Sequence, residues 1–555
     1  MTTSTDPVRE TGAIEPPTSG LRGASSRRAH LRAYRHHLRT MRTQALVWIG
    51  LLAGVGAGMI VAYEDTFPTA AEREGFARAV EGVPALEALF GRAVELATLE
   101  GFVLWRWGGF AVLLVAMWGM LSGSGLLRGA EEAGHLEPLR AGTLTPRGLV
   151  GTALAALLTL HVALAITVGA THTVLGMDAA TAWAFGAAFG LLAAVFAGGS
   201  ALVSQLVATR RRVNGVVGTA LGAAVVMRVV ASGSGTPDWL WWATPFGWTT
   251  FLHDADGARV QVLASLAVTA AVLLAAALVT ARRDLHGARF GGEEARAPGA
   301  QPVRSLTALS ARLTLGPTLA WGAAIVSAGL VFGLLAEDFA EVTAGVPQLV
   351  TILEQAGFVA LDTTEGVVAL ISGFLVLGLA LFAAAQATAI REEEASWRIQ
   401  ALLVRPLGRT RWYLDRVGAA AAAVVLLAAG TAVATWLGTA LAGTPLGAAD
   451  TTRMALNLIP IAWLFLGLGA ATFGLAPRIT AAVAYGLVLV TFLIDLIASM
   501  LDLPEAVSEF SPFAHLAPVP ADPLDGVGAA VMLVVGVVGV AAGAIAFRHR
   551  DLRAA

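Results

Sequence analysis

The chain of 555 residues is 56% hydrophobic and only 14% charged, whereas a globular domain usually carries about 25% charged residues. These proportions predict an integral membrane protein with most of its length in lipid. The formal net charge of −2 gives no global case for nucleic-acid binding, and the absence of cysteine excludes disulfides and thiol chemistry. All 37 basic residues are arginine. Because a P-loop needs a lysine for the nucleotide phosphates, the chain cannot carry an ordinary one.

The chain begins with a long polar segment. Residues 1–24 are rich in Thr, Ser, Pro and Gly and are predicted to be a disordered cytoplasmic tail. A cleavable signal peptide is not expected, because it would place its apolar region near the start. Residues 25–43 carry many arginines, with Leu31, Tyr34 and Met41 between them. This pattern predicts an interfacial helix on an anionic membrane surface, with nucleic-acid binding as the weaker alternative.

Twelve stretches approach the roughly 20 apolar residues that a transmembrane helix needs. The first six are residues 45–62, 102–122, 148–174, 182–207, 213–231 and 259–280. The second six are residues 314–335, 367–389, 413–441, 455–476, 479–500 and 526–547. Small residues are frequent, with 62 glycines, which lets membrane helices approach one another closely. The predicted fold class is therefore an all-α polytopic membrane protein.

Short motifs show that the chain is a repeat. Thr-Pro-Phe at 244–246 matches Ser-Pro-Phe at 511–513, and Arg-Asp-Leu at 283–285 matches the same motif at 550–552. Both pairs have the same offset, since 512 − 245 = 267 and 551 − 284 = 267. Glu-Gly at 100–101 matches Glu-Gly at 365–366, and Gly-Val-Pro at 82–84 matches 345–347.

Each repeat has an even number of predicted helices, so the two halves share one orientation, as parallel repeats about an axis along the membrane normal. The transmembrane halves are residues 25–285 and 303–555, joined by a linker of Gly, Pro and Ala at residues 286–302. The second half is also expected to open with an interfacial helix, near residues 303–315.

Arginine placement predicts the orientation of the helices. With both termini in the cytoplasm, the inner segments hold about 30 of the 37 arginines. The long loops at 64–101 and 336–366 are acidic and would lie outside. Each contains an amphipathic stretch, at 70–80 and 348–359, which predicts small helices over the alternative of unstructured acidic loops. The Trp-rich segment at 236–252 is expected to form a short interfacial or re-entrant helix.

A strongly polar segment occurs twice between the second and third helix of a half. Residues 391–411 read REEEASWRIQALLVRPLGRTR, and residues 128–147 read RGAEEAGHLEPLRAGTLTPR. Glu131 and Glu132 match Glu393 and Glu394. The longer copy predicts an amphipathic helix with its apolar face on residues 397, 401 and 404. The duplication favours a docking element for a soluble partner over two ordinary charged loops.

Catalytic and metal-binding motifs are absent from the sequence. It contains neither HExxH nor GxSxG. His161 and His172 share a helix face but have no acidic neighbour in the sequence, so packing or pore lining is favoured over metal binding. Trp183, Trp436 and Trp463 are interpreted as interfacial or packing residues rather than a ligand cage. We therefore predict a chain that is not itself an enzyme and holds no metal.

The duplicated polar segments, the six-helix halves and the Pro-Phe motifs together resemble the membrane subunits of ABC-2 type exporters. The similarity is strongest to fused two-half permeases of actinobacteria that export polyketide antibiotics (tetronasin type). It implies that residues 131–140 and 393–404 contain coupling helices that dock on an ATPase. The residues implied in docking are Glu131, Glu132, His135, Leu136, Glu137, Glu393, Glu394, Trp397 and Arg398. Gly134 and Pro138 weaken the first copy, so unequal contacts are expected.

The resemblance implies an ATP-driven exporter in the cell membrane, completed by two copies of a separate ATPase that binds ATP and Mg. It places the second and fifth helix of each half along the path of a hydrophobic or amphipathic compound, such as a drug, a polyketide antibiotic or a lipid. The alternatives are an ion-gradient-driven transporter and a non-transporting scaffold. A secondary transporter typically buries acids at mid-membrane, and few charges interrupt the predicted helices.

Two of those rare charges occupy equivalent positions. Arg228 lies in the fifth predicted helix and Asp495 in the eleventh, and 495 − 228 = 267, the offset of the other repeats. Charges in lipid are costly and usually pair inside the bundle. We hypothesise that the two side chains meet near the axis and close the outer end of the path. The alternative is that each reaches water by itself.

Overall fold

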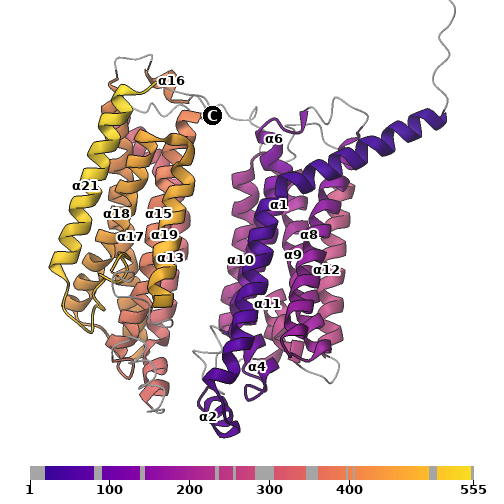
Figure 1. The fold of residues 1–555 in the computed structure, drawn as a ribbon, viewed down its shortest axis with the longest axis horizontal. Helices are drawn as coiled ribbons and strands as arrows, with labels where there is room; N and C mark the ends of the chain where they lie inside the picture. Colours follow the sequence, from indigo (N-terminus) through magenta and orange to yellow (C-terminus); the bar gives the residue numbers. More distant parts are fainter. Residues whose placement is uncertain are drawn as a thin grey trace, which may run out of the picture. The chain divides into compact units, whose positions relative to one another are not determined.

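The computed structural model describes residues 19–80, 90–137, 144–231, 237–253, 258–281, 305–344, 360–395, 398–403, 407–498 and 509–551. The chain divides into two compact units, Met1–Ala297 and Pro298–Ala555. Figure 1 shows each unit as a bundle of long helices. The division falls inside the predicted linker at 286–302, which itself lies outside the described residues.

The described part of the first unit is made of long helices and short helical turns. They are α1 (Ser19–Thr66), α2 (Ala70–Val80), α4 (Leu99–Val103), η1 (Leu104–Gly108), α5 (Gly109–Ser124), η2 (Gly125–Gly129), α6 (Ala130–Glu132), α8 (Pro146–Val174), α9 (Ala179–Leu206), α10 (Arg210–Ala231), η3 (Asp238–Ala243), α11 (Pro245–Trp248), η4 (Thr249–His253) and α12 (Ala258–Thr280). The helices α4, η1, α5, η2 and α6 run on without a break, with π-helical turns at η1 and η2.

The second unit contains α13 (Leu306–Ala344), α15 (Thr364–Ala395), α16 (Arg398–Leu403), α17 (Arg409–Ala442), α18 (Ala448–Leu475), η6 (Pro477–Ile479), α19 (Thr480–Ala498) and α21 (Gly526–His549). In the described part of the whole chain, eleven helices are long and apolar enough to cross a membrane. The remaining predicted span, 213–231, lies in α10, a 22-residue helix that opens with three arginines and is not among those eleven. The structure confirms an all-α polytopic membrane protein.

The predicted interfacial helices are not separate elements. α1 runs from Ser19 through Thr66 as one 48-residue helix, so the basic segment at 25–43 continues into the apolar span. Figure 1 shows its N-terminal part leaving the bundle at an angle. Neither Pro nor Gly occurs at residues 43–46, between the predicted interfacial helix and the predicted span, so no residue there interrupts the helix. Likewise, the segment predicted as an interfacial helix at 303–315 belongs to α13, which begins at Leu306. Of the tail predicted at residues 1–24, residues 1–18 lie outside the described residues, and residues 19–24 belong to α1.

The same helix pairs pack in both units. In the first unit α8 contacts α1 and α9, α9 contacts α5, α10 and α12, and α5 contacts α10. In the second unit α17 contacts α13 and α18, α18 contacts α15, α19 and α21, and α15 contacts α19. These pairs correspond one to one in chain order. Each half is therefore the same arrangement of six long helices.

The start of the second helix in each half is capped in the same way. Thr98 Oγ1 accepts a hydrogen bond from Gly101 N at 3.0 Å, and Thr363 Oγ1 accepts one from Gly366 N at 3.1 Å. A threonine at this position satisfies a backbone N–H that the helix leaves without a partner. The residues three positions earlier, Glu95 and Ala360, both have positive φ, 52° and 53°. The Glu-Gly repeat seen in the sequence is thus part of a repeated cap.

The Pro-Phe motifs also have equivalent roles. Phe246 is fully buried and stacks on Phe196 of α9 at 5.7 Å, while Phe513 is 5% exposed and packs on Phe465 of α18 at 5.9 Å. The Trp-rich segment around Phe246 is helical, but it forms three short helices, η3, α11 and η4, and its interfacial or re-entrant position stays a prediction. The predicted helix at 70–80 is α2, whereas 348–359 lies outside the described residues.

Glycines let α18 and α21 touch along their backbones. A Cβ built on Gly467 would overlap the carbonyl oxygen of Gly536, and one on Gly474 would overlap that of Gly543. The two contacts are two helical turns apart on each helix, so they form one seam. Small residues at such a seam stabilise membrane helices through close van der Waals packing.

Candidate functional site

In the first half, the polar segment begins with an ion pair inside the protein. Nη1 of Arg128, in η2, lies 3.1 Å from Oε2 of Glu131, in α6. The two side chains are only 1% and 3% exposed. An acidic side chain near the C-terminal end of a helix is disfavoured by the helix dipole. The guanidinium of Arg128 offsets this cost, so Glu131 is held against its own helix rather than presented outward.

The next acid joins two helices. Oε1 of Glu132 accepts a hydrogen bond from the backbone N–H of Arg210 at 2.7 Å, at the start of α10. The first N–H groups of a helix have no partner within it, and an acid there is also favoured by the helix dipole. Glu132 therefore ties the end of the second helix to the beginning of the fifth.

The rest of the first segment alternates between surface and core. His135 and Glu137 are exposed, whereas Leu136 is 5% exposed. Leu136 belongs to an apolar cluster with Ala33 of α1 and with Leu144 and Leu149. Of the docking residues predicted in this segment, Glu132, His135 and Glu137 reach the surface, while Glu131 and Leu136 do not.

In the second half, the acids lie in the last turn of α15. α15 continues through Glu394 to Ala395, and α16 begins at Arg398. The predicted helix at 393–404 is thus helical at 393–395 and 398–403, and its residues 396, 397 and 404 lie outside the described residues. Trp397 lies outside the described residues, and the side chain of Arg398 is likewise not described. Ile399 of α16, which the sequence prediction missed, is 1% exposed and packs with Trp412 and Leu306.

Glu393 is paired with an arginine of the next helix. Oε1 of Glu393 lies 2.7 Å from Nη2 of Arg416 in α17, whose side chain is 3% exposed. Nη1 of Arg416 also donates to the carbonyl of Ser310 at 3.2 Å and to Thr314 Oγ1 at 2.9 Å, both in α13. One guanidinium thus links α15, α17 and α13.

Glu394 is paired with the last helix. Its carboxylate accepts hydrogen bonds from Nη1 and Nη2 of Arg550 at 2.6 and 2.5 Å. The Arg550 guanidinium also lies 5.1 Å from the ring centroids of Phe473 and Phe547. A bidentate pair of this kind is stronger and more directional than a single contact. It fixes the end of α15 to the C-terminal end of α21.

The sequence contained a signal for one of these partners. Arg550 opens the second copy of the repeated Arg-Asp-Leu motif, although the motif served only to define the repeat. Arg416 and Arg210 lie just inside the helices that follow polar or basic stretches, and nothing in the local pattern distinguishes them from neighbouring arginines. Docking on an ATPase stays a prediction for all the residues named in the sequence.

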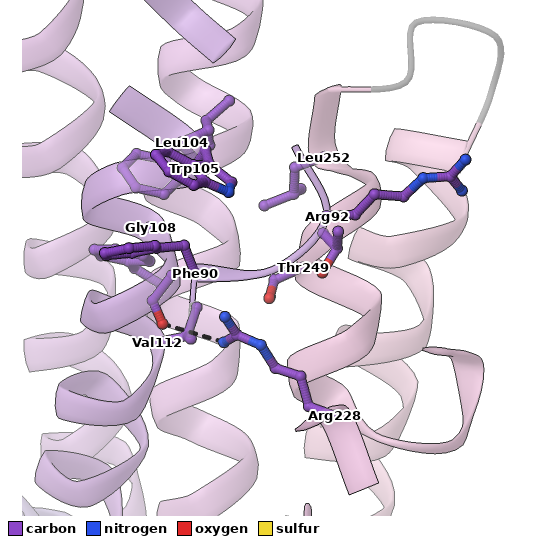
Figure 2. A pocket seen from close by; sticks show the side chains of 13 residues that line it. Phe90, Arg92, Leu104, Trp105, Gly108, Val112, Arg228, Thr249 and Leu252 are labelled. Carbon is purple, nitrogen blue, oxygen red and sulfur yellow. Dashed lines mark hydrogen bonds between the residues drawn. The ribbon is translucent and has the colours of Figure 1, made fainter. Parts of the chain in front are cut away.

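A second feature surrounds Arg228 of α10 (Figure 2). Arg228 is 4% exposed, and its Nη1 donates to the carbonyl oxygen of Gly109 at 3.1 Å, which ties α10 to the start of α5. The guanidinium faces a cavity of about 20 Å³ that is lined by Phe90, Trp105 and Thr249, among others. That volume holds about one water molecule. Asp495 is half-buried in the last turn of α19, and its pairing with Arg228 stays a prediction.

The histidines singled out in the sequence are packed against aromatic rings. His161 is 2% exposed and meets Trp118 edge-on at 5.2 Å, and His172 meets Phe185 at 5.7 Å. Within the described residues, no group of three or more His, Asp or Glu side chains could hold a metal ion. Trp463 Nε1 donates to the carbonyl of Leu533 at 3.0 Å, while Trp183 and Trp436 are partly exposed.

Comparison with known proteins identifies the family of the chain. It is 30% identical over 545 residues to the multidrug efflux system permease protein Rv1217c of Mycobacterium tuberculosis, and the match covers 94% of each chain. Residues 303–548 match the family model described as the multidrug efflux system permease Rv1217c, C-terminal domain. The chain belongs to the Rv1217c family of multidrug efflux permeases.

The matched C-terminal domain contains most of the charged residues that pair around the end of α15. It begins just before α13, includes Glu393, Glu394 and Arg416, and ends two residues before Arg550. The match to the relative covers 94% of each chain, so it includes both halves and not only the C-terminal half.

Proposed function

We propose that the chain is the membrane subunit of an ABC-2 type exporter that moves hydrophobic or amphipathic compounds out of the cell. The observation that carries the proposal is the match along 94% of its length to a multidrug efflux system permease. The two equivalent helix bundles, each with a polar segment after its second long helix, support it. Drugs, polyketide antibiotics of the tetronasin type and lipids are the candidate substrates.

In this proposal a separate ATPase, in two copies, supplies the energy and binds ATP and Mg. The chain has no lysine with which to form its own P-loop. The exposed side chains of Glu132, His135 and Glu137 would contact one copy, and the α16 region with Trp397 and Arg398 the other. Three of the predicted docking acids would not contact the ATPase themselves. Their ion pairs would instead connect each docking segment to the long helices; these acids are Glu131, Glu393 and Glu394.

The arginine distribution supports a cell-membrane location with both termini in the cytoplasm. In that orientation the two polar segments lie on the inner side, where an ATPase could reach them. The second and fifth long helices of each half, α5, α10, α15 and α19, would line the transport path. Arg228 and Asp495 would then lie towards its outer end.

The decisive experiment uses the purified full chain with and without an ABC ATPase encoded beside its gene. We expect the isolated chain to hydrolyse no ATP, the ATPase to co-purify with it, and proteoliposomes holding both to move ethidium only with ATP and Mg. ATP hydrolysis by the contaminant-free chain would overturn the assignment of roles. Ethidium movement by the chain alone under an ion gradient would identify a secondary transporter instead.

A further inference from the structure

The N-terminal part of α1 has two opposite faces. Its arginines at positions 28, 32, 35, 39 and 42 are exposed and follow each other at intervals of four and three residues, so they form one stripe along the helix. On the opposite face Ala33, His37 and Met41 are 0%, 2% and 5% exposed. The stripe therefore points away from the helices on which α1 packs.

The buried face of this segment rests on α8 and on the first docking segment. Tyr34 Oη lies 2.9 Å from Thr159 Oγ1 of α8, within hydrogen-bonding distance. Ala33 shares an apolar cluster with Leu136 of the docking segment and with Leu149 of α8. The basic segment and Leu136 therefore share one packed apolar cluster, through which a shift of α1 would affect the docking segment.

The arginine stripe leads directly into exposed apolar surface. Leu46, one turn after Arg42 on the same side of the helix, is 72% exposed, and the same helix continues as a candidate membrane span. A basic cluster that adjoins a membrane span lies within reach of lipid headgroups, where each arginine adds to the attraction of an anionic surface.

We infer that the stripe binds anionic phospholipid headgroups and that this contact holds the docking segment in its working position. The lipid headgroups hold the N-terminal part of α1, which packs with Leu136 in one cluster. Leu136 in turn positions its exposed neighbours His135 and Glu137. The second step rests on the proposed function, because it assumes that an ATPase docks there; the first step does not.

The first step is tested without any ATPase. Because the chain has no cysteine, His36→Cys gives a single fluorophore site on the exposed side of the segment. The full chain is placed in phosphatidylcholine nanodiscs that contain a small amount of headgroup-spin-labelled phosphatidylglycerol or, in the matched sample, headgroup-spin-labelled phosphatidylcholine. We expect spin-labelled phosphatidylglycerol to quench the fluorescence at a concentration about tenfold or more below that which spin-labelled phosphatidylcholine needs. This preference for the anionic lipid should weaken at high salt.

Three variants decide what causes that preference. Replacing the five stripe arginines by Gln should abolish it, while replacing them by Lys should keep it, because the attraction depends on charge. The matched control, Arg211→Gln with Arg478→Gln, removes exposed arginines elsewhere and should keep it too. Equal quenching by both lipids in the unaltered stripe, or a preference that survives the five Gln substitutions, would overturn the inference.

The second step is measured as substrate-stimulated ATP hydrolysis of the assembled complex. We expect stimulation in discs that contain phosphatidylglycerol and its loss in phosphatidylcholine alone, in the five-Gln variant and in Leu136→Ala. Leu136→Ala should keep the lipid preference, since it cuts only the link to the docking segment. Full stimulation in both lipids would overturn this step and leave the proposed function standing. Failure of any ATPase to bind would count against the proposed function and leave the quenching result unaffected.

Discussion

Glu394 and Arg550 join helices that lie far apart in the chain, through two hydrogen bonds of 2.6 and 2.5 Å. Glu394 is 4% exposed and Arg550 16%. Removing one partner of a buried pair leaves the other charge without compensation. We expect Glu394→Gln to lower the free energy of unfolding by about 2 kcal/mol, below the cost for a fully buried pair because water still reaches Arg550. Thermal unfolding in detergent measures it.

Glu392, two residues earlier on the same helix and exposed, provides the control. Glu392→Gln should change the stability by less than about 0.5 kcal/mol, as is usual for surface positions. Equal effects of the two substitutions would show that the ion pair contributes nothing specific.

A second prediction separates docking from internal support. Glu393→Arg with Glu394→Arg should uncouple or detach the ATPase, but this variant also breaks the pairs with Arg416 and Arg550. The exchange Glu394→Arg with Arg550→Glu restores an internal pair while leaving a changed charge at position 394. We expect it to recover most of the substrate-stimulated ATP hydrolysis that Glu394→Arg loses. No recovery, with normal folding, would mean that Glu394 contacts the ATPase directly.

A third prediction concerns the seam between α18 and α21. A methyl group on Gly474 would overlap the carbonyl of Gly543, so Gly474→Ala must push the helices apart. We expect it to destabilise the protein by about 1–3 kcal/mol. Gly418→Ala in α17, where an added Cβ meets no neighbouring atom, is the control and should be neutral or slightly stabilising. Thermal unfolding of the two variants side by side checks the prediction, and equal stability would refute a close seam.

The fourth prediction tests the proposed outer gate. Arg228 already donates to the carbonyl of Gly109, so Arg228→Asp should impair folding or leave the path leaky whether or not Asp495 is its partner. Asp495→Arg should do the same if the two charges pair. In that case the double exchange restores export, with a coupling energy of at least about 1 kcal/mol. Dye leakage from proteoliposomes and ATP-driven efflux give the readout, and simple additivity of the two single effects would show that no pair forms.

The long helices were predictable because each needs only local information. The predicted spans at 148–174 and 526–547 correspond to Pro146–Val174 and Gly526–His549, since length and apolarity identify a helix in lipid. The repeat was also readable, because the capping threonines and the buried Pro-Phe motifs are fixed to short sequence patterns.

The environment of the acids was not predictable from the sequence. Glu394 and Arg550 are 156 residues apart, and only the packing of α15, α18 and α21 decides that they meet. The π-helical turn η2 has no sequence signature either. It lies where Gly125 and Gly129 face the side chain of Arg210, a residue 81 or more positions away in the chain. Both results depend on tertiary contacts that a periodicity pattern does not contain.

The two acid pairs have different partners, and this difference predicts that the two halves differ in stiffness. In the second half, Glu393 and Glu394 attach the end of α15 to α13, α17 and α21, so a displacement of α16 must move several long helices together. In the first half, Glu131 pairs with Arg128 of the same helical end, and Glu132 accepts a hydrogen bond from the backbone N–H at the start of α10. If two copies of an ATPase drive the proposed exporter through equal displacements, we expect the second half to respond more stiffly than the first.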